Sequence, residues 1–149
     1  HPMAAGLSLP TENIDLFRAK LNRQQTLTEK ELTPVTWIDV PMPVSYASKK
    51  LVEQLRVLEP FGKGNEKPVF ADRKLTVRSA NMIGKNKNVL KMQLEDTHGH
   101  VVDAIQFKVE EEDMPLRGKE ISIVYYPDIN EFRGNQTLQF IVQEWCYTT

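Results

Sequence analysis

The chain has 149 residues, of which 40% are hydrophobic and 26% charged, and its formal net charge is −1. This composition is typical of a folded globular protein and excludes a disordered or fibrous chain. No apolar run approaches the roughly 18 residues that a membrane-spanning helix needs, so we expect no association with a membrane. Cys146 is the single cysteine, so no disulfide can form within the chain and a cytoplasmic location is expected.

The charge is unevenly distributed along the chain. Residues 60–108 hold nine Lys or Arg against five Asp or Glu, a net charge of +4. Residues 109–149 hold three bases against eight acids, a net charge of −5. A polyanion would therefore be attracted to the middle segment.

The first segment is predicted to be a loop followed by helix. The opening "HPMAAGLSLP" has no signal-peptide features and no initiator Met, so we expect a fragment of a longer protein. Apolar residues recur at spacings of three and four from Ile14 to Leu21, which predicts an amphipathic helix with Thr11 or Asn13 as its N-cap. Thr28 and Glu31 have the spacing of a capping box and predict one further helical turn.

A short strand and a second, clearer helix are predicted next. The stretch "VTWIDVPMPV" is rich in strand-forming residues, but its two prolines restrict it to a short edge strand. In "SYASKKLVEQLRVLEPFG" three leucines share one helical face, with Ser45 or Ser48 as the N-cap. Pro60 and Gly62 end this helix.

After Phe70 the apolar pattern changes from a period near 3.6 to a period near 2, which indicates strands. Five strands are predicted, at about 74–80, 89–95, 101–108, 120–126 and 137–145. A longer interruption separates the third strand from the fourth, as in an OB fold. The fold class is therefore an α+β N-terminal fragment followed by an all-β, five-stranded OB-type Greek-key barrel.

No set of residues with catalytic or metal-binding spacing is present. His1, His98 and His100 fall in no metal-binding motif, and the glycines of "FGKGN" follow a helix rather than the strand of a phosphate-binding loop. We expect no catalytic residue and no metal site in this chain.

A surface for single-stranded nucleic acid is better supported. OB barrels bind single strands with basic side chains for the phosphates and exposed aromatic rings on which bases stack. Basic and aromatic residues lie in the first and last predicted hairpins, although one of Tyr125 and Tyr126 must face the core. The candidate DNA-binding residues are Arg78, Lys85, Lys87, Lys91, Tyr126, Phe132, Arg133, Asn135 and Gln136. A protein-interaction module remains the alternative.

Three stretches resemble DHH-family phosphoesterases. "HPMAAG" resembles the end of the GGHxxAAG signature of the DHH-associated domain, and "LEPFGKGNEKPVF" resembles the LxPFGxGNPxPxF segment that leads into the OB domain of RecJ-type single-stranded-DNA exonucleases. "INEFRGNQTLQFIVQEW" is similar to the last hairpin of the RecJ OB domain. The three stretches have the order and spacing that the family shows. One residue departs from the family pattern, because Glu66 stands where the family has proline.

The resemblance implies how the chain is divided into domains and which activity the parent protein has. Residues 1–59 would be the C-terminal part of a DHH-associated-like domain with its connecting helix, residues 60–70 a rigid junction, and residues 71–149 an OB-fold domain that binds single-stranded DNA. The parent would be a RecJ-like 5′-to-3′ single-stranded-DNA exonuclease of recombination and repair that uses Mn²⁺ or Mg²⁺.

The resemblance also implies what this chain lacks. The metal ligands of such enzymes lie in an upstream DHH domain, so this fragment is expected to be catalytically inert. His1 matches the motif histidine and would contact the substrate backbone. Under the alternative, the OB fold would dock a partner such as a single-strand-binding protein.

Overall fold

The structure is a computed structural model that describes residues 4–148. Its contacts divide the chain into two units, one before and one after the bond between Thr36 and Trp37. Among the described residues, no helix is long and apolar enough to cross a membrane.

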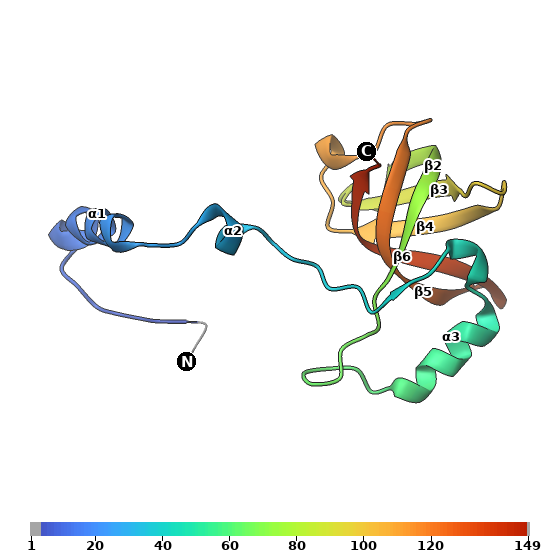
Figure 1. The fold of residues 1–149 in the computed structure, drawn as a ribbon, viewed down its shortest axis with the longest axis horizontal. Coiled ribbons are helices and arrows are strands. Elements are labelled where there is room, and N and C mark those ends of the chain that lie inside the picture. The colour runs from blue at the N-terminus through green and yellow to red at the C-terminus, as the bar shows by residue number, and fades with distance from the viewer. Residues whose placement is uncertain (1–3, 149) are drawn as a thin grey trace. The chain divides into compact units, whose positions relative to one another are not determined.

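The first unit is helical, as predicted. It contains the 3₁₀ turn η1 (Thr11–Asn13), helix α1 (Ile14–Gln24) and the one-turn helix α2 (Glu29–Leu32) (Figure 1). Asn13 is the N-cap residue of α1, but its side chain makes no capping hydrogen bond. The predicted capping box of α2 is confirmed, because Glu31 N–H donates to the Thr28 hydroxyl and the Thr28 N–H donates to the Glu31 carboxylate at 2.9 Å. Neither α1 nor α2 contains a buried residue.

The second unit places a connecting helix before a sheet of six strands. It begins with β1 (Val40–Pro41), η2 (Val44–Tyr46), α3 (Lys49–Leu55) and η3 (Arg56–Leu58). The long strands are β2 (Phe70–Ile83), β3 (Val89–Glu95), β4 (Val101–Phe107), β5 (Glu120–Phe132) and β6 (Asn135–Tyr147), with η4 (Glu111–Asp113) between β4 and β5. The predicted barrel has five strands, and the sixth strand is the short edge strand β1, which pairs in parallel with β2.

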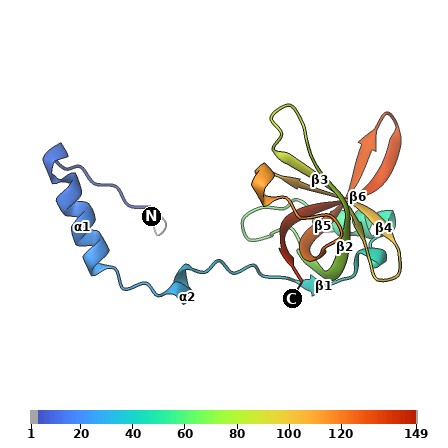
Figure 2. The same ribbon diagram turned by 90° about the horizontal axis from the view of Figure 1, so that it is seen from above.

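The sheet closes on itself because β2 pairs with β5 as well as with β3. The strand order is β1-β2-β3-β4-β6-β5, and β5 also pairs with β2. All pairings around this ring are antiparallel except the one between β4 and β6. In Figure 2 the β2–β3 and β5–β6 hairpins project from the same side of the sheet. The pairing is consistent with an OB fold.

The inward faces of the strands form the core. The predicted alternation of β3 is confirmed, since Leu90, Met92 and Leu94 are fully buried while the residues between them are exposed. In β6, Phe140 and Val142 are likewise buried. Burying these side chains against one another supplies most of the stability of a small closed sheet.

The segment before α3 is attached to the sheet by polar contacts. The Tyr125 hydroxyl donates to the Met42 carbonyl oxygen at 2.8 Å, and the Val44 N–H donates to the Asp72 carboxylate at 2.8 Å. Burial raises the pKa of Tyr125, so its hydroxyl keeps the proton that it donates. The Ser48 hydroxyl caps α3 by accepting from the Leu51 N–H, as predicted.

The segment from Leu58 to Phe70 is a closed loop with internal hydrogen bonds. The Asn65 side-chain amide donates to the Leu58 and Pro60 carbonyl oxygens at 2.8 and 3.0 Å. Phe61 contacts the Tyr126 ring edge-on, with 6.3 Å between ring centroids, and the Lys67 ammonium lies 4.0 Å from the Tyr126 centroid. These contacts favour an ordered junction, and its rigidity remains a prediction.

The contact between Tyr125 and Met42 gives a test of how the connecting segment is held. We expect Tyr125→Phe to lower the free energy of unfolding by about 1 kcal/mol, because the Met42 carbonyl loses its donor. Urea denaturation measures the change. Tyr46→Phe is the matched control, since Tyr46 is 75% exposed, and should change stability by less than about 0.5 kcal/mol. Equal effects of the two variants would contradict the assignment.

The junction can be tested separately. Asn65→Ala removes both side-chain hydrogen bonds, so backbone amides of residues 58–66 should exchange with solvent on the order of tenfold faster. Hydrogen-exchange mass spectrometry measures this rate. Glu66→Ala, an exposed change in the same loop, should leave it unaltered. If Asn65→Ala left exchange unchanged, the loop would not depend on this side chain.

Candidate nucleic-acid interface

A groove of about 310 Å³ lies between the outer face of β3 and β4 and the β5–β6 hairpin. Lys91 of β3 pairs with Ile105 of β4 in the antiparallel ladder, and both side chains line the groove. Their inward-facing neighbours Leu90, Met92 and Ala104 are fully buried, which directs Lys91 and Ile105 outward. The floor of the groove, formed by β3 and β4, therefore combines the cation of Lys91 with the carboxylate of Asp103 and the apolar side chain of Ile105.

The β5–β6 hairpin forms one wall of the groove. Its two-residue turn consists of Arg133 and Gly134, with φ of +51° and +80°, as a type I′ turn requires. Phe132 is 65% exposed, and the Arg133 guanidinium lies 5.1 Å from its ring centroid. Phe132 and Asn135, paired directly before and after the turn, both line the groove. The hairpin thus presents an exposed ring beside a cation and an amide.

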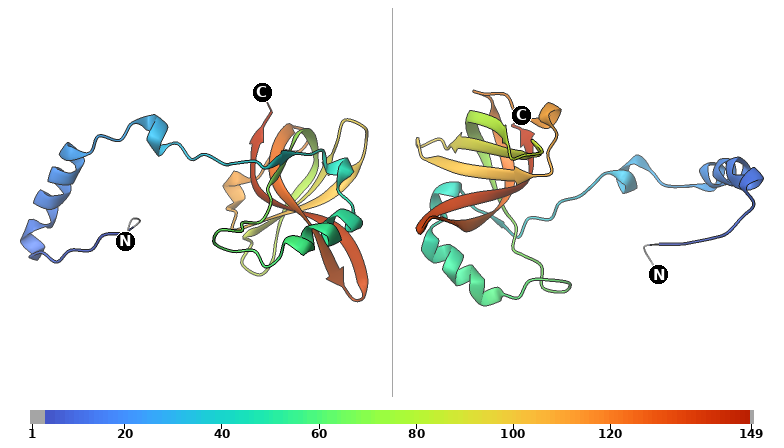
Figure 3. Two further views of the ribbon diagram at one scale, coloured as in Figure 1. Left: turned by 60° about the horizontal axis from the view of Figure 1, so that its bottom comes forward. Right: turned by 180° about the vertical axis from the view of Figure 1, so that it is seen from behind.

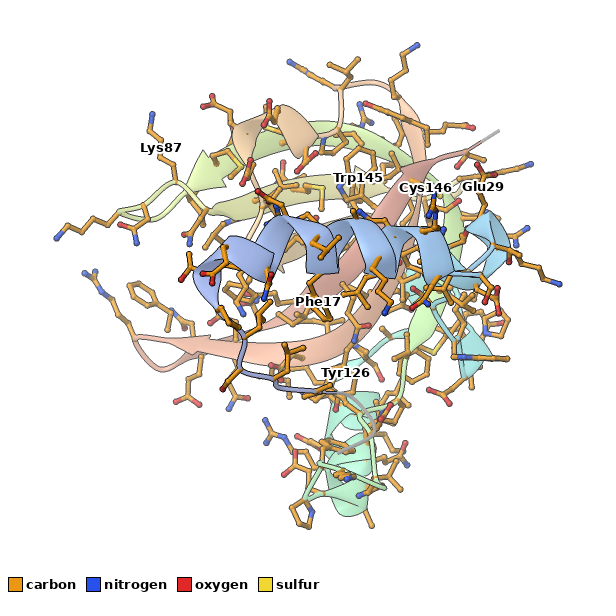
Figure 4. All side chains as sticks on the ribbon, turned by 90° about the vertical axis from the view of Figure 1, so that its left-hand side faces the viewer. Phe17, Glu29, Lys87, Tyr126, Trp145 and Cys146 are labelled. Carbon is orange, nitrogen blue, oxygen red and sulfur yellow. The ribbon has the colours of Figure 1, made fainter. Side chains whose placement is uncertain are left out.

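The β2–β3 turn supplies further positive charge at the same end of the sheet. Lys85 and Lys87 are exposed in this turn, and Lys87 has a φ of +46°. Figure 4 shows Lys87 projecting from the turn into solvent. The hairpins carrying Lys87 and Arg133 project together in Figure 2. A strand of nucleic acid lying in the groove would pass between these two basic turns.

The structure brings together most of the residues predicted from sequence. Lys91, Phe132 and Asn135 line one groove, with Lys85, Lys87 and Arg133 in the turns beside it. The sequence analysis missed six lining residues, which are Asp103, Ile105, Asn130, Thr137, Leu138 and Gln139. Strand alternation could have found Ile105 and Gln139, but only the register between strands places them at this groove.

Two predicted contact residues have other partners, and a third prediction is not described by the structure. Arg78 forms an ion pair with Glu95, near the end of β3 away from the turn. The Gln136 side chain donates to the Glu131 carboxylate at 3.2 Å. The prediction for His1 falls outside the described residues.

The placement of Tyr126 corrects the sequence analysis. Both Tyr125 and Tyr126 are buried, Tyr125 against Phe70 and Phe140 and Tyr126 against Phe61 and Lys67 of the junction. Burial raises the pKa of the Tyr126 phenol, with Asp128 adding to the effect. At 4% exposure, the ring is covered by the junction and cannot stack on a base in this arrangement.

A closed sheet with a groove between the outer face of β3 and β4 and the β5–β6 hairpin is typical of an OB-type domain. Residues 38–144 match the family described as the RecJ OB domain, and the chain belongs to this family. This match confirms the resemblance seen in the sequence.

Relatives and a solved structure agree with this family. The chain is 36% identical over 146 residues to the single-stranded-DNA-specific exonuclease RecJ of Haemophilus influenzae, and 31% identical over 147 residues to that of Bacillus subtilis. These matches cover 95% and 97% of this chain but 25% and 19% of the relatives, so the chain spans a quarter or less of their length. RecJ of Thermus thermophilus in complex with Mn²⁺ superposes with a TM-score of 0.67 at 16% identity, over 96% of this chain and 20% of that one.

The turn geometry predicts which substitutions the hairpin tolerates. Gly134→Ala places a Cβ at a φ of +80° and should lower stability by about 1 kcal/mol, although no atom lies within 4 Å of that Cβ. Arg133→Asn should change stability by less than about 0.5 kcal/mol, because asparagine tolerates positive φ. Thermal unfolding of both variants measures the difference. Equal stabilities would contradict the assigned turn.

Proposed function

We propose that this chain is the part of a RecJ-like 5′-to-3′ exonuclease that binds and positions single-stranded DNA, acting in recombination and repair in the cytoplasm. The observation that carries the proposal is the groove in which Lys91 of β3 meets Phe132 and Asn135 of the β5–β6 hairpin, between two basic turns. The relatives that match nearly all of this chain are called single-stranded-DNA-specific exonucleases.

Each kind of side chain in the groove suits one part of the ligand. The edges of the groove carry three positive charges on long exposed side chains, those of Lys85, Lys87 and Arg133. These side chains would neutralise phosphates. The exposed Phe132 ring offers a face on which any base can stack, a contact worth about 1–3 kcal/mol. The side-chain amides of Asn130 and Asn135 both donate and accept hydrogen bonds, so they would hold different bases without strict selection.

Nuclease chemistry is assigned to the rest of the full-length protein. Among the described residues, no group of three or more His, Cys, Asp or Glu side chains is placed to hold a metal ion, so this part of the chain does not fit a Mn²⁺ or Mg²⁺ site. Residues 1–59, with α1 and the connecting helix α3, would form the end of a DHH-associated domain. Ile14 and Leu21 on α1 are 42% and 51% exposed, which supports a further contact for this helix in the longer protein.

Fluorescence anisotropy with labelled oligo-dT tests the binding function. We expect the combined change Lys85→Gln, Lys87→Asn and Arg133→Asn to weaken binding by at least about tenfold at low salt. It should also reduce the slope of log K against log salt by about two, because each phosphate contact on a single strand contributes about 0.7. Asparagine replaces the two residues with positive φ, so lost affinity reports charge rather than turn strain.

The matched control removes three charges away from the groove. Lys63, Arg117 and Lys119 are exposed and do not line it, and their combined change to glutamine should leave the salt slope unaltered. Equal losses in the two triple variants would mean that only net charge matters and would contradict the groove. Absence of oligonucleotide affinity in the unchanged chain would instead favour docking of a protein such as a single-strand-binding protein.

A further inference from the structure

The β5–β6 hairpin extends beyond the part of the sheet that is paired on both sides. Pairing between β2 and β5 ends at Tyr125, and β6 pairs with β4 only at Phe140 and Ile141. Within the described residues, the strands from Asp128 to Gln139 therefore pair only with each other. A two-stranded ribbon is marginally stable alone and its direction is easily changed. The sheet by itself does not fix where the Phe132 wall of the groove stands.

One side chain from outside the sheet reaches this ribbon. The Lys49 ammonium donates to the Gln136 carbonyl oxygen at 2.6 Å, joining the first residue of α3 to the second residue of β6. Gln136 pairs with Glu131 and follows Asn135, which lines the groove. The hydrogen bond therefore holds the hairpin at Gln136, the residue next to Asn135 of the groove wall.

The helix that carries Lys49 is itself firmly attached. Val52 of α3 is 1% exposed, and Ser48 caps the first turn of the helix. Helix α3 contacts β5, and Figure 3 shows it lying beside the hairpin. Lys49 thus connects a ribbon whose two strands pair only with each other to a helix that the core holds in place.

We propose that Lys49 is a positioning residue for the DNA-binding groove. Its ammonium holds the β5–β6 hairpin so that Phe132 and Asn135 stand opposite Lys91, and it acts through the Gln136 carbonyl rather than on the ligand. Lys49 is not among the residues that line the groove. This role rests on the proposed function, because it concerns the geometry of the same groove.

The chain provides a close control. Lys50 follows Lys49 on α3, is also exposed, and makes no hydrogen bond to the hairpin among the contacts described for residues 4–148. Lys49→Met and Lys50→Met each remove one positive charge at nearly the same place. Lys49→Arg keeps the charge and the donor, so it should restore the bond.

The first measurement needs no DNA. Hydrogen-exchange mass spectrometry should show faster amide exchange across residues 131–137 in Lys49→Met, by about two- to tenfold, and no change in Lys50→Met or Lys49→Arg. Unchanged exchange in Lys49→Met would overturn the proposal, whether or not the chain binds DNA.

The second measurement separates positioning from direct contact. With oligo-dT, Lys49→Met should bind about two- to tenfold more weakly at every salt concentration with the same salt slope as the unchanged chain, and Lys49→Arg should restore affinity. A slope reduced by about 0.7 would show that Lys49 neutralises a phosphate and would overturn the positioning role. If no variant binds DNA, the proposed function fails, and the exchange measurement still decides whether Lys49 holds the hairpin.

Discussion

Strand β2 must pair on both sides for this domain to exist, and everything else in the second unit follows from how it does so. Its first half pairs with β5 and its second half with β3, which closes the sheet. The change of partner falls where the register shifts, between Asp72 and Leu75 and again between Val77 and Ser79. Bulges bend and twist a strand, and Lys74 adopts a φ of +60° within the first irregularity. Leu75 and Val77 are fully buried between them, so the strand bends around the core that it helps to form.

Closure also explains why the groove lies where it does. In a closed sheet the side chains of β3 and β4 alternate between a filled interior and the outside, so Lys91 and Ile105 have only the outer face available. The hairpins before β3 and after β5 then stand beside that face. A basic turn, the outward side chains of β3 and β4 and an exposed ring lie there although they are distant in the sequence. The domain thus combines a rigid floor with walls made of hairpins.

Local sequence patterns predicted the parts of this arrangement that depend on near neighbours. The alternation of β3, the capping box at Thr28 and the cap of α3 at Ser48 all involve residues within a few positions of one another. The long strands were also expected, although β2, β5 and β6 extend beyond their predicted bounds because bulges let a strand continue where its alternation breaks.

What the sequence did not reveal depends on register and on contacts between distant segments. Tyr126 carries the correct chemistry for stacking but is buried beneath Phe61 and Lys67, which are distant from it in the sequence. Ile105 reaches the groove only because β4 pairs with β3 at Lys91. Lys49 contacts Gln136, 87 residues away in the sequence, and no spacing rule connects them. Predicting these features requires knowing how distant segments pack and pair with one another. The positions of the strands in the sequence are not enough.

The contacts of the junction determine how a mechanical load would travel through the domain. A pull on the segment before Phe70 reaches β2 through the peptide chain and β5 through the contact of Phe61 and Lys67 with Tyr126. These two strands are neighbours, and β5 continues directly to the hairpin that carries Phe132. Strand β2 also pairs with β3, which carries Lys91 on the floor of the groove. Tension at the junction would therefore reach the Phe132 wall through β5 and the floor through β2 and β3, so a single attachment point is coupled to both sides of the groove.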